Sequence, residues 1–206
     1  MIVNKIRHMS NKLDIGILFV SDYSLKFTGR EVAWKVGLSP QIALNNLNNL
    51  VKEKIFLVEK QGRNNLFGLN LKDFGCLMFL SLVEEYRGLG SLKNKELKGL
   101  VEELLPLAET LIVFGSFASG KQGKDSDIDL IALGVKDRKK FNKVKRSFPR
   151  EVNVEFLSWR EFKKACLEKK ALAVEVAKNH LVYGNVFNLV KTYKEIKWIK
   201  KEGYCL

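Results

Sequence analysis

The chain has 206 residues, which is enough for one large domain or two small ones. Hydrophobic residues make up 46% of it and charged residues 29%, which excludes a disordered or fibrous protein, and its apolar runs are far shorter than the roughly 20 residues of a membrane helix. The formal charge of +13 raises the expectation of a polyanionic partner. The N-terminus lacks a continuous apolar signal core, so we expect a cytoplasmic protein without membrane contact.

Two helices separated by a tight glycine turn are predicted in the first third of the chain. The Thr-Gly-Arg-Glu sequence at residues 28–31 is a capping box that opens a short helix ending at Gly37. Ser39 followed by Pro40 then supplies an N-cap with proline at the first helical position. The second helix has one apolar stripe: Ala43, Leu47 and Leu50.

A β-hairpin is predicted directly after these helices. Residues 55–59 and 66–69 are apolar enough for two strands, and the polar residues 60–65 between them form the turn. Helix, turn, helix and hairpin in this order resemble the winged helix-turn-helix domains of bacterial and archaeal regulators. The domain that this resemblance implies covers residues 1–70.

In winged helix-turn-helix domains the second helix of the pair enters the DNA major groove and the hairpin touches the backbone or the minor groove. The resemblance therefore implies duplex DNA as a partner, contacted by exposed residues of the second helix and by Arg63 on the wing. The exposed helix positions are Gln41, Ile42, Leu44, Asn45, Asn48 and Asn49. Phosphate contacts normally dominate affinity, and this helix has no Lys or Arg before Lys52. Dimerisation, docking of a protein and an inherited scaffold are therefore the alternative roles.

Residues 71–108 are predicted to be a helical connector. Helices are expected over residues 72–87 and 93–108, and the Gly-Leu-Gly-Ser sequence at residues 88–91 is expected to be a hinge between them.

Two short sequences in the second half of the chain contain candidate phosphate-binding and metal-binding residues. An apolar strand, residues 111–114, ends at Gly115-Ser116, where a missing side chain lets backbone N–H groups approach a phosphate. A second strand begins with Asp127 and Asp129, whose side chains project from the same face because side chains alternate along a strand. Two carboxylates this close repel each other unless a cation lies between them, and oxygen ligands suit Mg²⁺.

A third strand, residues 152–157, supplies a further carboxylate. It alternates apolar and polar residues, with Asn153 and Glu155 on one face, and we expect Glu155 to complete the site. Asp127, Asp129 and Glu155 would hold one or two Mg²⁺ ions, with Glu155 as ligand or general base, in a site for phosphoryl or nucleotidyl transfer. Other metal chemistry is not expected, because the sequence has three widely spaced cysteines and two isolated histidines.

The glycine-serine turn, ten further residues and then Asp-Ile-Asp resemble the signature of the polymerase-beta-type nucleotidyltransferase superfamily. Residues 95–187 look most like the minimal nucleotidyltransferases of prokaryotes. This resemblance implies that Gly115 and Ser116 hold the terminal phosphates of a nucleoside triphosphate and that Ser126 orients the loop or a phosphate. Many members carry Arg at the position of Ser119, so here Lys121 or Lys124 would supply the positive charge.

The sequence therefore predicts an α/β (α+β) chain: a winged helix-turn-helix, the connector, and a polymerase-beta-like nucleotidyltransferase domain over residues 109–206 with a small mixed sheet. The expected activity is Mg²⁺-dependent transfer of a nucleoside monophosphate from a nucleoside triphosphate to a hydroxyl of a protein, an RNA or a small molecule. The resemblance also suggests a small helical protein partner, as in toxin–antitoxin pairs, and a homodimer is possible. The alternative is a DNA-binding transcription regulator whose nucleotidyltransferase domain senses nucleotide or is inert.

Two basic helices are predicted in the second half. Residues 136–150 carry eight basic side chains and one acidic one, which indicates either a solvated helix face or a surface for nucleotide, nucleic acid or an acidic protein. Residues 191–201 are expected to form a basic amphipathic helix.

Overall fold

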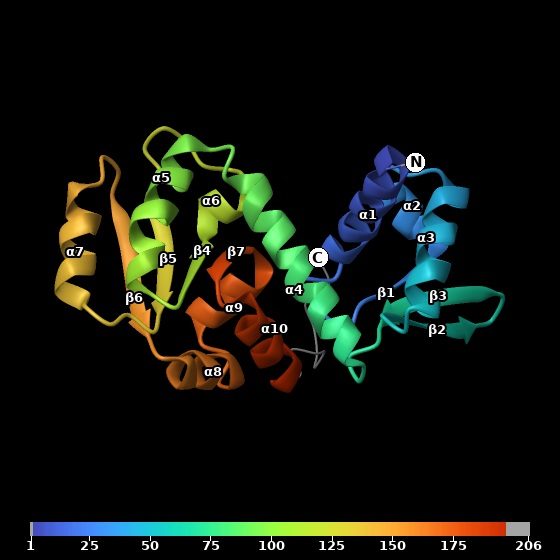
Figure 1. Cartoon of the computed structure of the whole chain (residues 1–206). Helices are drawn as coiled ribbons and strands as arrows, with labels where there is room; N and C mark the ends of the chain where they lie inside the picture. Colours follow the sequence, from blue (N-terminus) through green and yellow to red (C-terminus); the bar gives the residue numbers. More distant parts are fainter. Residues whose placement is uncertain (1, 197–206) are drawn as a thin grey trace. The chain divides into compact units, whose positions relative to one another are not determined.

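Figure 1 shows a computed structural model of the chain, which describes the backbone of residues 2–196 and the side chains of residues 9–196. The chain divides into two compact units. The N-terminal unit contains the residues up to Val83 together with those from Tyr193, and the C-terminal unit is Glu84–Thr192. The division falls inside one helix, so residues 71–108 are shared between the two units. Among the described residues, no helix combines the length and apolar content that a membrane crossing requires.

The N-terminal unit is built from helices and one small antiparallel sheet. Its first six elements are α1 (Ile2–Ile17), β1 (Lys26–Thr28), α2 (Gly29–Val36), α3 (Pro40–Lys52), β2 (Phe56–Gln61) and β3 (Asn64–Leu69). The strands lie in the order β1-β3-β2 (Figure 1). Phe19 and Phe56, the first residue of β2, are buried and pack with their rings edge to face. The unit's core is therefore formed by residues far apart in the sequence.

The predicted helix pair is confirmed, together with its caps. The Thr28 hydroxyl accepts a hydrogen bond from the Glu31 N–H, and the Glu31 carboxylate accepts one from the Thr28 N–H. These bonds to Thr28 also hold the pKa of Glu31 below its usual value. Gly37 ends α2 in the left-handed conformation with φ 67°, and Ser39 caps α3. Local sequence alone determines this turn.

The predicted hairpin is present, but its turn is tighter than the sequence suggested. Residues 60–65 were expected to form the turn, whereas β2 and β3 stay paired as far as Gln61 opposite Asn64. Gly62 and Arg63 make the connection, and Gly62 has φ 60°. A glycine in this conformation lets two strands turn within two residues, so the polar residues on either side can extend the ladder.

The predicted hinge at residues 88–91 is wrong, because α4 runs unbroken from Phe74 to Ser91. A methyl group on Gly88 would lie only 3.0 Å from the carbonyl oxygen of Val182. This glycine therefore permits close packing of the helix against a strand, and does not supply flexibility. Ser91 continues the contact, since its hydroxyl bonds the Gly88 carbonyl and lies 2.6 Å from the Tyr183 hydroxyl.

The C-terminal unit holds a four-stranded sheet with the order β6-β5-β4-β7 (Figure 1). Its elements after α4 are α5 (Lys95–Leu104), a 3₁₀ turn (Leu105–Leu107), β4 (Thr110–Phe114), α6 (Gly115–Ser119), β5 (Ile128–Leu133), α7 (Arg138–Ser147), β6 (Val152–Leu157), α8 (Trp159–Leu167), α9 (Ala171–Lys178), β7 (His180–Gly184) and α10 (Val186–Glu195). Strands β5 and β6 are parallel and the other neighbours antiparallel, which confirms the predicted mixed sheet. Of the predicted terminal helix, residues 191–201, the first five residues form the end of α10, and residues 197–201 lie outside the described residues.

The sheet's alternation decides which side carries the candidate site. Ile128, Leu130 and Ala132 of β5 belong to the buried core that also takes in the apolar face of α5 and Phe141 of α7. Side chains at the odd positions of β5 therefore point to the other face. Asp129 has this parity, so the core packing turns its carboxylate away from α5 and α7.

Candidate active site

A sharp turn between β4 and α6 forms one wall of the candidate site. Gly115 follows the buried strand β4 and adopts φ 66°, a left-handed conformation that glycine accepts without strain. A methyl group at this position would also lie 2.6 Å from Oδ2 of Asp129. The absent side chain thus lets the carboxylate of the neighbouring strand approach the turn.

Strand pairing brings the two predicted aspartates to the same edge of the sheet. Asp129 lies opposite Phe114 of β4 on one side and opposite Asn153 of β6 on the other. Nδ2 of Asn153 lies 3.4 Å from Oδ2 of Asp127 and 3.4 Å from Oδ1 of Asp129. One amide therefore donates to both carboxylates, and the close pair expected from the Asp-Ile-Asp sequence is present.

Glu155 pairs in register with a residue further along β5 than either aspartate. It shares the face of Asn153, but its register partner on β5 is Ile131, two residues beyond Asp129. Among the described side chains, no group of three or more His, Cys, Asp or Glu residues is arranged to hold a metal ion. Alternation of apolar and polar residues places Asn153 and Glu155 on one face of β6, and the register of β6 against β5 puts Asn153 directly opposite Asp129.

The residues at this edge nevertheless fit a divalent cation. Mg²⁺ in nucleotide sites commonly takes one or two carboxylates and completes its shell with substrate phosphates and water. Asp127 and Asp129 meet that need, and a half-turn of the Asn153 amide would exchange its donor nitrogen for an acceptor oxygen.

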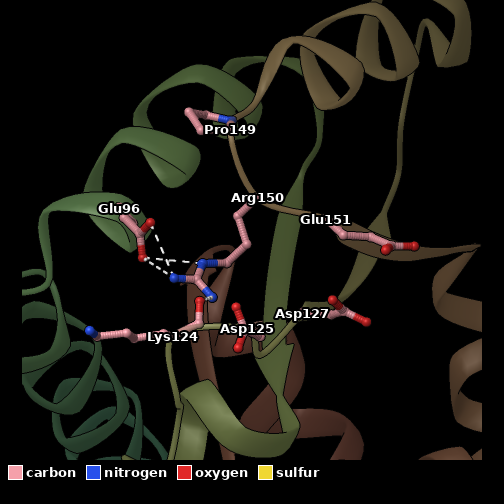
Figure 2. A pocket seen from close by; sticks show the side chains of 7 residues that line it. All are labelled: Glu96, Lys124, Asp125, Asp127, Pro149, Arg150 and Glu151. Carbon is pink, nitrogen blue, oxygen red and sulfur yellow. Dashed lines mark hydrogen bonds and ion pairs between the residues drawn. The ribbon is translucent and has the colours of Figure 1, made fainter.

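The loop between α6 and β5 has an internal hydrogen-bond network. The Ser126 hydroxyl accepts a hydrogen bond of 2.8 Å from the Gly123 N–H, which joins two residues of the loop. The Lys121 N–H donates to the carbonyl oxygen of Ser116, which closes the turn after α6. The Lys121 and Lys124 side chains are exposed, and that of Lys124 extends away from Asp127 (Figure 2).

Arg150 is a residue of this site that sequence reasoning missed. Its guanidinium lies between Glu96 of α5 and the backbone of the loop (Figure 2). Together these groups line a pocket with the following residues: Glu96, Lys124, Asp125, Asp127, Pro149, Arg150 and Glu151. In the sequence, Arg150 is one of the eight basic residues in the segment 136–150, and no local pattern distinguishes it from the other seven.

A buried ion pair supports the opposite side of β4. His180 of β7 pairs with Phe114 in register, and its Nε2 lies 3.1 Å from Oε1 of Glu84, while Arg87 donates to the second carboxylate oxygen. Burial raises the pKa of Glu84, but the charges and hydrogen bonds of His180 and Arg87 outweigh burial and lower it overall. The pair therefore holds a charged carboxylate inside the C-terminal unit.

Burial raises the pKa of both Cys76 and Cys166 to about 12, so these two residues stay protonated thiols. Cys205 lies outside the described residues.

The predicted DNA-contacting residues lie on α3 and at the hairpin turn of the N-terminal unit. Gln41, Ile42, Asn45 and Asn48 are exposed, Asn49 is half-buried, and Arg63 is exposed between β2 and β3. The Gln41 side chain donates a 2.9 Å hydrogen bond to Oδ1 of Asn45, which links neighbouring turns of α3.

The mixed α/β structure of the C-terminal unit, with its four-stranded sheet, is consistent with a nucleotidyltransferase fold. A family model described as a nucleotidyltransferase domain matches residues 94–203, more than half of the chain. The chain belongs to this nucleotidyltransferase family. No curated protein and no solved structure matches it.

Proposed function

We propose that the protein transfers a nucleoside monophosphate from a nucleoside triphosphate to a hydroxyl group of an acceptor, with a divalent cation held by Asp127 and Asp129. The observation that carries the proposal is the approach of the Asp129 carboxylate to Gly115, at a distance that no other amino acid at position 115 would permit. Membership of the nucleotidyltransferase family supports the same reaction class.

Each part of the site has a role in this proposal. The backbone of Gly115 and the hydroxyl of Ser116 bind the terminal phosphates, because the turn presents donors without an intervening side chain. Lys121 and Lys124 supply positive charge from the loop. The acceptor oxygen bonds to the α-phosphorus, the bond from that phosphorus to the bridging oxygen breaks, and pyrophosphate leaves.

The cation, when bound, would neutralise charge on the phosphates and favour ionisation of the attacking hydroxyl. Asp127 and Asp129 are its proposed ligands, and Asn153 lies within reach of both. Glu155 as a third ligand or general base stays a prediction. The acceptor classes that we consider are a small helical protein partner, an RNA end and a small molecule.

Calorimetry tests the binding step. Each of the four nucleoside triphosphates is titrated with Mg²⁺ into the wild type and into Asp127→Asn/Asp129→Asn. We expect heat from the wild type only, and only with Mg²⁺ present. A Glu102→Gln variant is the control, because this carboxylate on α5 is exposed and lies outside the pocket that contains Asp127. No binding of any nucleotide to folded wild type would reject the proposal.

A labelled α-phosphate then identifies the acceptor. Transfer of label to a protein band, to RNA or to a small molecule from a cell extract separates the three classes, and loss of transfer in the double aspartate variant ties it to this site.

A second candidate function is DNA binding by the N-terminal unit as a winged helix-turn-helix. What supports it is the order of α2, the Gly37 turn, α3 and the β2–β3 hairpin, with exposed amide side chains on α3. Amide side chains can pair with adenine in the major groove. In this alternative the protein is a transcription regulator whose C-terminal unit senses nucleotide or is inert.

Fluorescence anisotropy with a labelled DNA duplex of mixed sequence, measured over a range of salt concentrations, tests this candidate. A regulator binds the duplex with an affinity that falls steeply with salt, loses binding in Gln41→Ala/Asn45→Ala, and keeps it in Asp127→Asn/Asp129→Asn. No binding even at low salt would reject DNA as a partner. Light scattering on the same samples reports whether the protein is a homodimer.

A further inference from the structure

One guanidinium group joins three parts of the C-terminal unit. Arg150 donates through Nε and Nη2 to the carboxylate of Glu96 on α5, at 3.0 to 3.3 Å. Its Nη1 donates to carbonyl oxygens of the loop before β5, the shortest bond being 2.6 Å to Ser126. The charged group also lies 5.5 Å from the ring centre of Phe117 on α6. Arg150 thus contacts the helix, the loop and the turn element at once.

The position of the Ser126 bond makes this contact relevant to the site. Ser126 is the residue immediately before Asp127, and its carbonyl oxygen belongs to the peptide group that leads into that aspartate. Asp127 precedes the first residue of β5, so the strand ladder does not hold it directly. The first cross-strand bond beyond it is made by the Ile128 N–H, which donates to the Glu151 carbonyl. Arg150 therefore fixes the chain on the side of Asp127 that the sheet leaves unsupported.

The chemistry of the contact favours arginine over lysine. A guanidinium is planar and presents donors in a fixed fork, which can serve a carboxylate and several carbonyls together. A lysine ammonium has three donors on a flexible stem and cannot reproduce this pattern. The Arg150 side chain is 17% exposed and the Glu96 side chain 47%, so solvent weakens the pair less than a fully exposed one.

We infer that Arg150, oriented by Glu96, is a positioning residue that holds the loop so that Asp127 lies beside Asp129 before any ligand binds. The inference rests on the proposed function, since it assigns a role toward the nucleotide and its cation. Misplacement of a reacting or binding group by about 1 Å can cost as much as a hundredfold in rate. A loop that is held in position before the ligand binds avoids this loss of rate.

Hydrogen exchange of the free protein tests the loop directly. We compare the wild type with Arg150→Lys and Glu96→Gln, and follow the backbone amides of residues 121–127. Both variants are expected to exchange about tenfold faster in this segment, because charge-assisted hydrogen bonds are lost. Arg146→Lys on α7 and Glu102→Gln on α5 are matched controls that make the same changes at exposed positions of the same unit. Amides of β4 should exchange at the wild-type rate throughout.

Calorimetry separates positioning from general stability. We expect the Mg²⁺ concentration for half-maximal nucleotide binding to rise about tenfold in Arg150→Lys and Glu96→Gln. The double variant should be no worse than Arg150→Lys alone, because Glu96 acts through Arg150. A merely structural contact would lower the melting temperature and leave the Mg²⁺ midpoint of the folded protein unchanged.

Unchanged exchange of the loop in both variants would overturn the inference, and so would faster exchange with an unchanged Mg²⁺ midpoint. Failure of the wild type to bind nucleotide would instead reject the proposed function, and the exchange comparison would still show whether Arg150 holds the loop.

Discussion

Gly115 and Asp129 approach each other so closely that the space for a Cβ atom at position 115 is occupied by the Asp129 carboxylate. The two residues belong to different elements, and the antiparallel pairing of β4 with β5 brings them together. The absence of a side chain at Gly115 therefore leaves room for the Asp129 carboxylate as well as for the proposed phosphate. Substitution of Gly115 should disturb the binding of both the cation and the nucleotide.

Gly115→Ala is expected to abolish Mg²⁺-dependent nucleotide binding, because the new methyl group would lie 2.6 Å from Oδ2 of Asp129 and displace it. Gly120→Ala is the matched control. Gly120 has nearly the same φ, 68°, but open space around its Cβ position. Alanine at position 120 therefore incurs only the backbone strain of about 1 to 2 kcal/mol. Calorimetry and thermal unfolding of both variants measure the two effects. Equal loss of binding in both would show that strain, not contact with Asp129, is responsible.

Asn153→Asp tests which residue occupies the third position. The variant replaces the amide that donates to Asp127 and Asp129 with a carboxylate that repels them. We expect its melting temperature to fall below that of the wild type in EDTA and to rise more than that of the wild type when Mg²⁺ is added.

Glu155→Gln, measured in the same way, is expected to respond to Mg²⁺ as the wild type does, since Glu155 lies beside Ile131 and not beside Asp129. Loss of Mg²⁺-dependent nucleotide binding in Glu155→Gln, with little effect of Asn153→Asp, would support the original prediction that Glu155 is the third carboxylate.

Gly88→Ala and Gly90→Ala should have opposite effects on stability, although both glycines lie in the predicted hinge. The methyl group at position 88 would press on the Val182 carbonyl and destabilise the protein by about 1 to 3 kcal/mol. Gly90 has open space, so alanine there should stabilise the helix by about 0.5 to 1 kcal/mol. Urea unfolding measures both. Destabilisation by Gly90→Ala would indicate that α4 does break at this point.

Glu84→Gln is expected to destabilise the protein by about 2 kcal/mol at pH 7, because it removes the charge that His180 and Arg87 face. The pKa of Glu84 is lower in the folded chain than its ordinary value of 4.5, so its contribution is fully present above pH 4.5 and is lost as the pH falls through the folded-state pKa. The difference between wild type and variant should therefore shrink below pH 4.5.

Urea unfolding at pH 7 and pH 3 measures this difference, with Glu85→Gln, an exposed neighbour on the same helix, as the control. A difference that stays constant between the two pH values would contradict the assignment of a charged, paired Glu84.

The sequence by itself determined the local features of this protein. The caps of α2 and α3 are confirmed, because capping bonds act within a few residues. The mixed sheet, which was expected from the family resemblance, is confirmed as well. The Gly-Ser turn and the spacing to Asp127 and Asp129 were enough to predict the family, since these residues lie close together in the chain.

Tertiary structure decided what depends on distant partners. The register of β6 against β5 puts Asn153 beside Asp129. Alternation alone shows that Asn153 and Glu155 share a face, but not which of the two lies opposite Asp129. The Gly-Leu-Gly-Ser sequence predicts a hinge, but Gly88 packs against Val182, which is 94 residues away in the sequence. In the sequence Arg150 resembles its basic neighbours, and only the fold brings it into contact with Glu96 and the Ser126 carbonyl. Such long-range contacts are set by packing of the whole unit, so no local pattern reveals them.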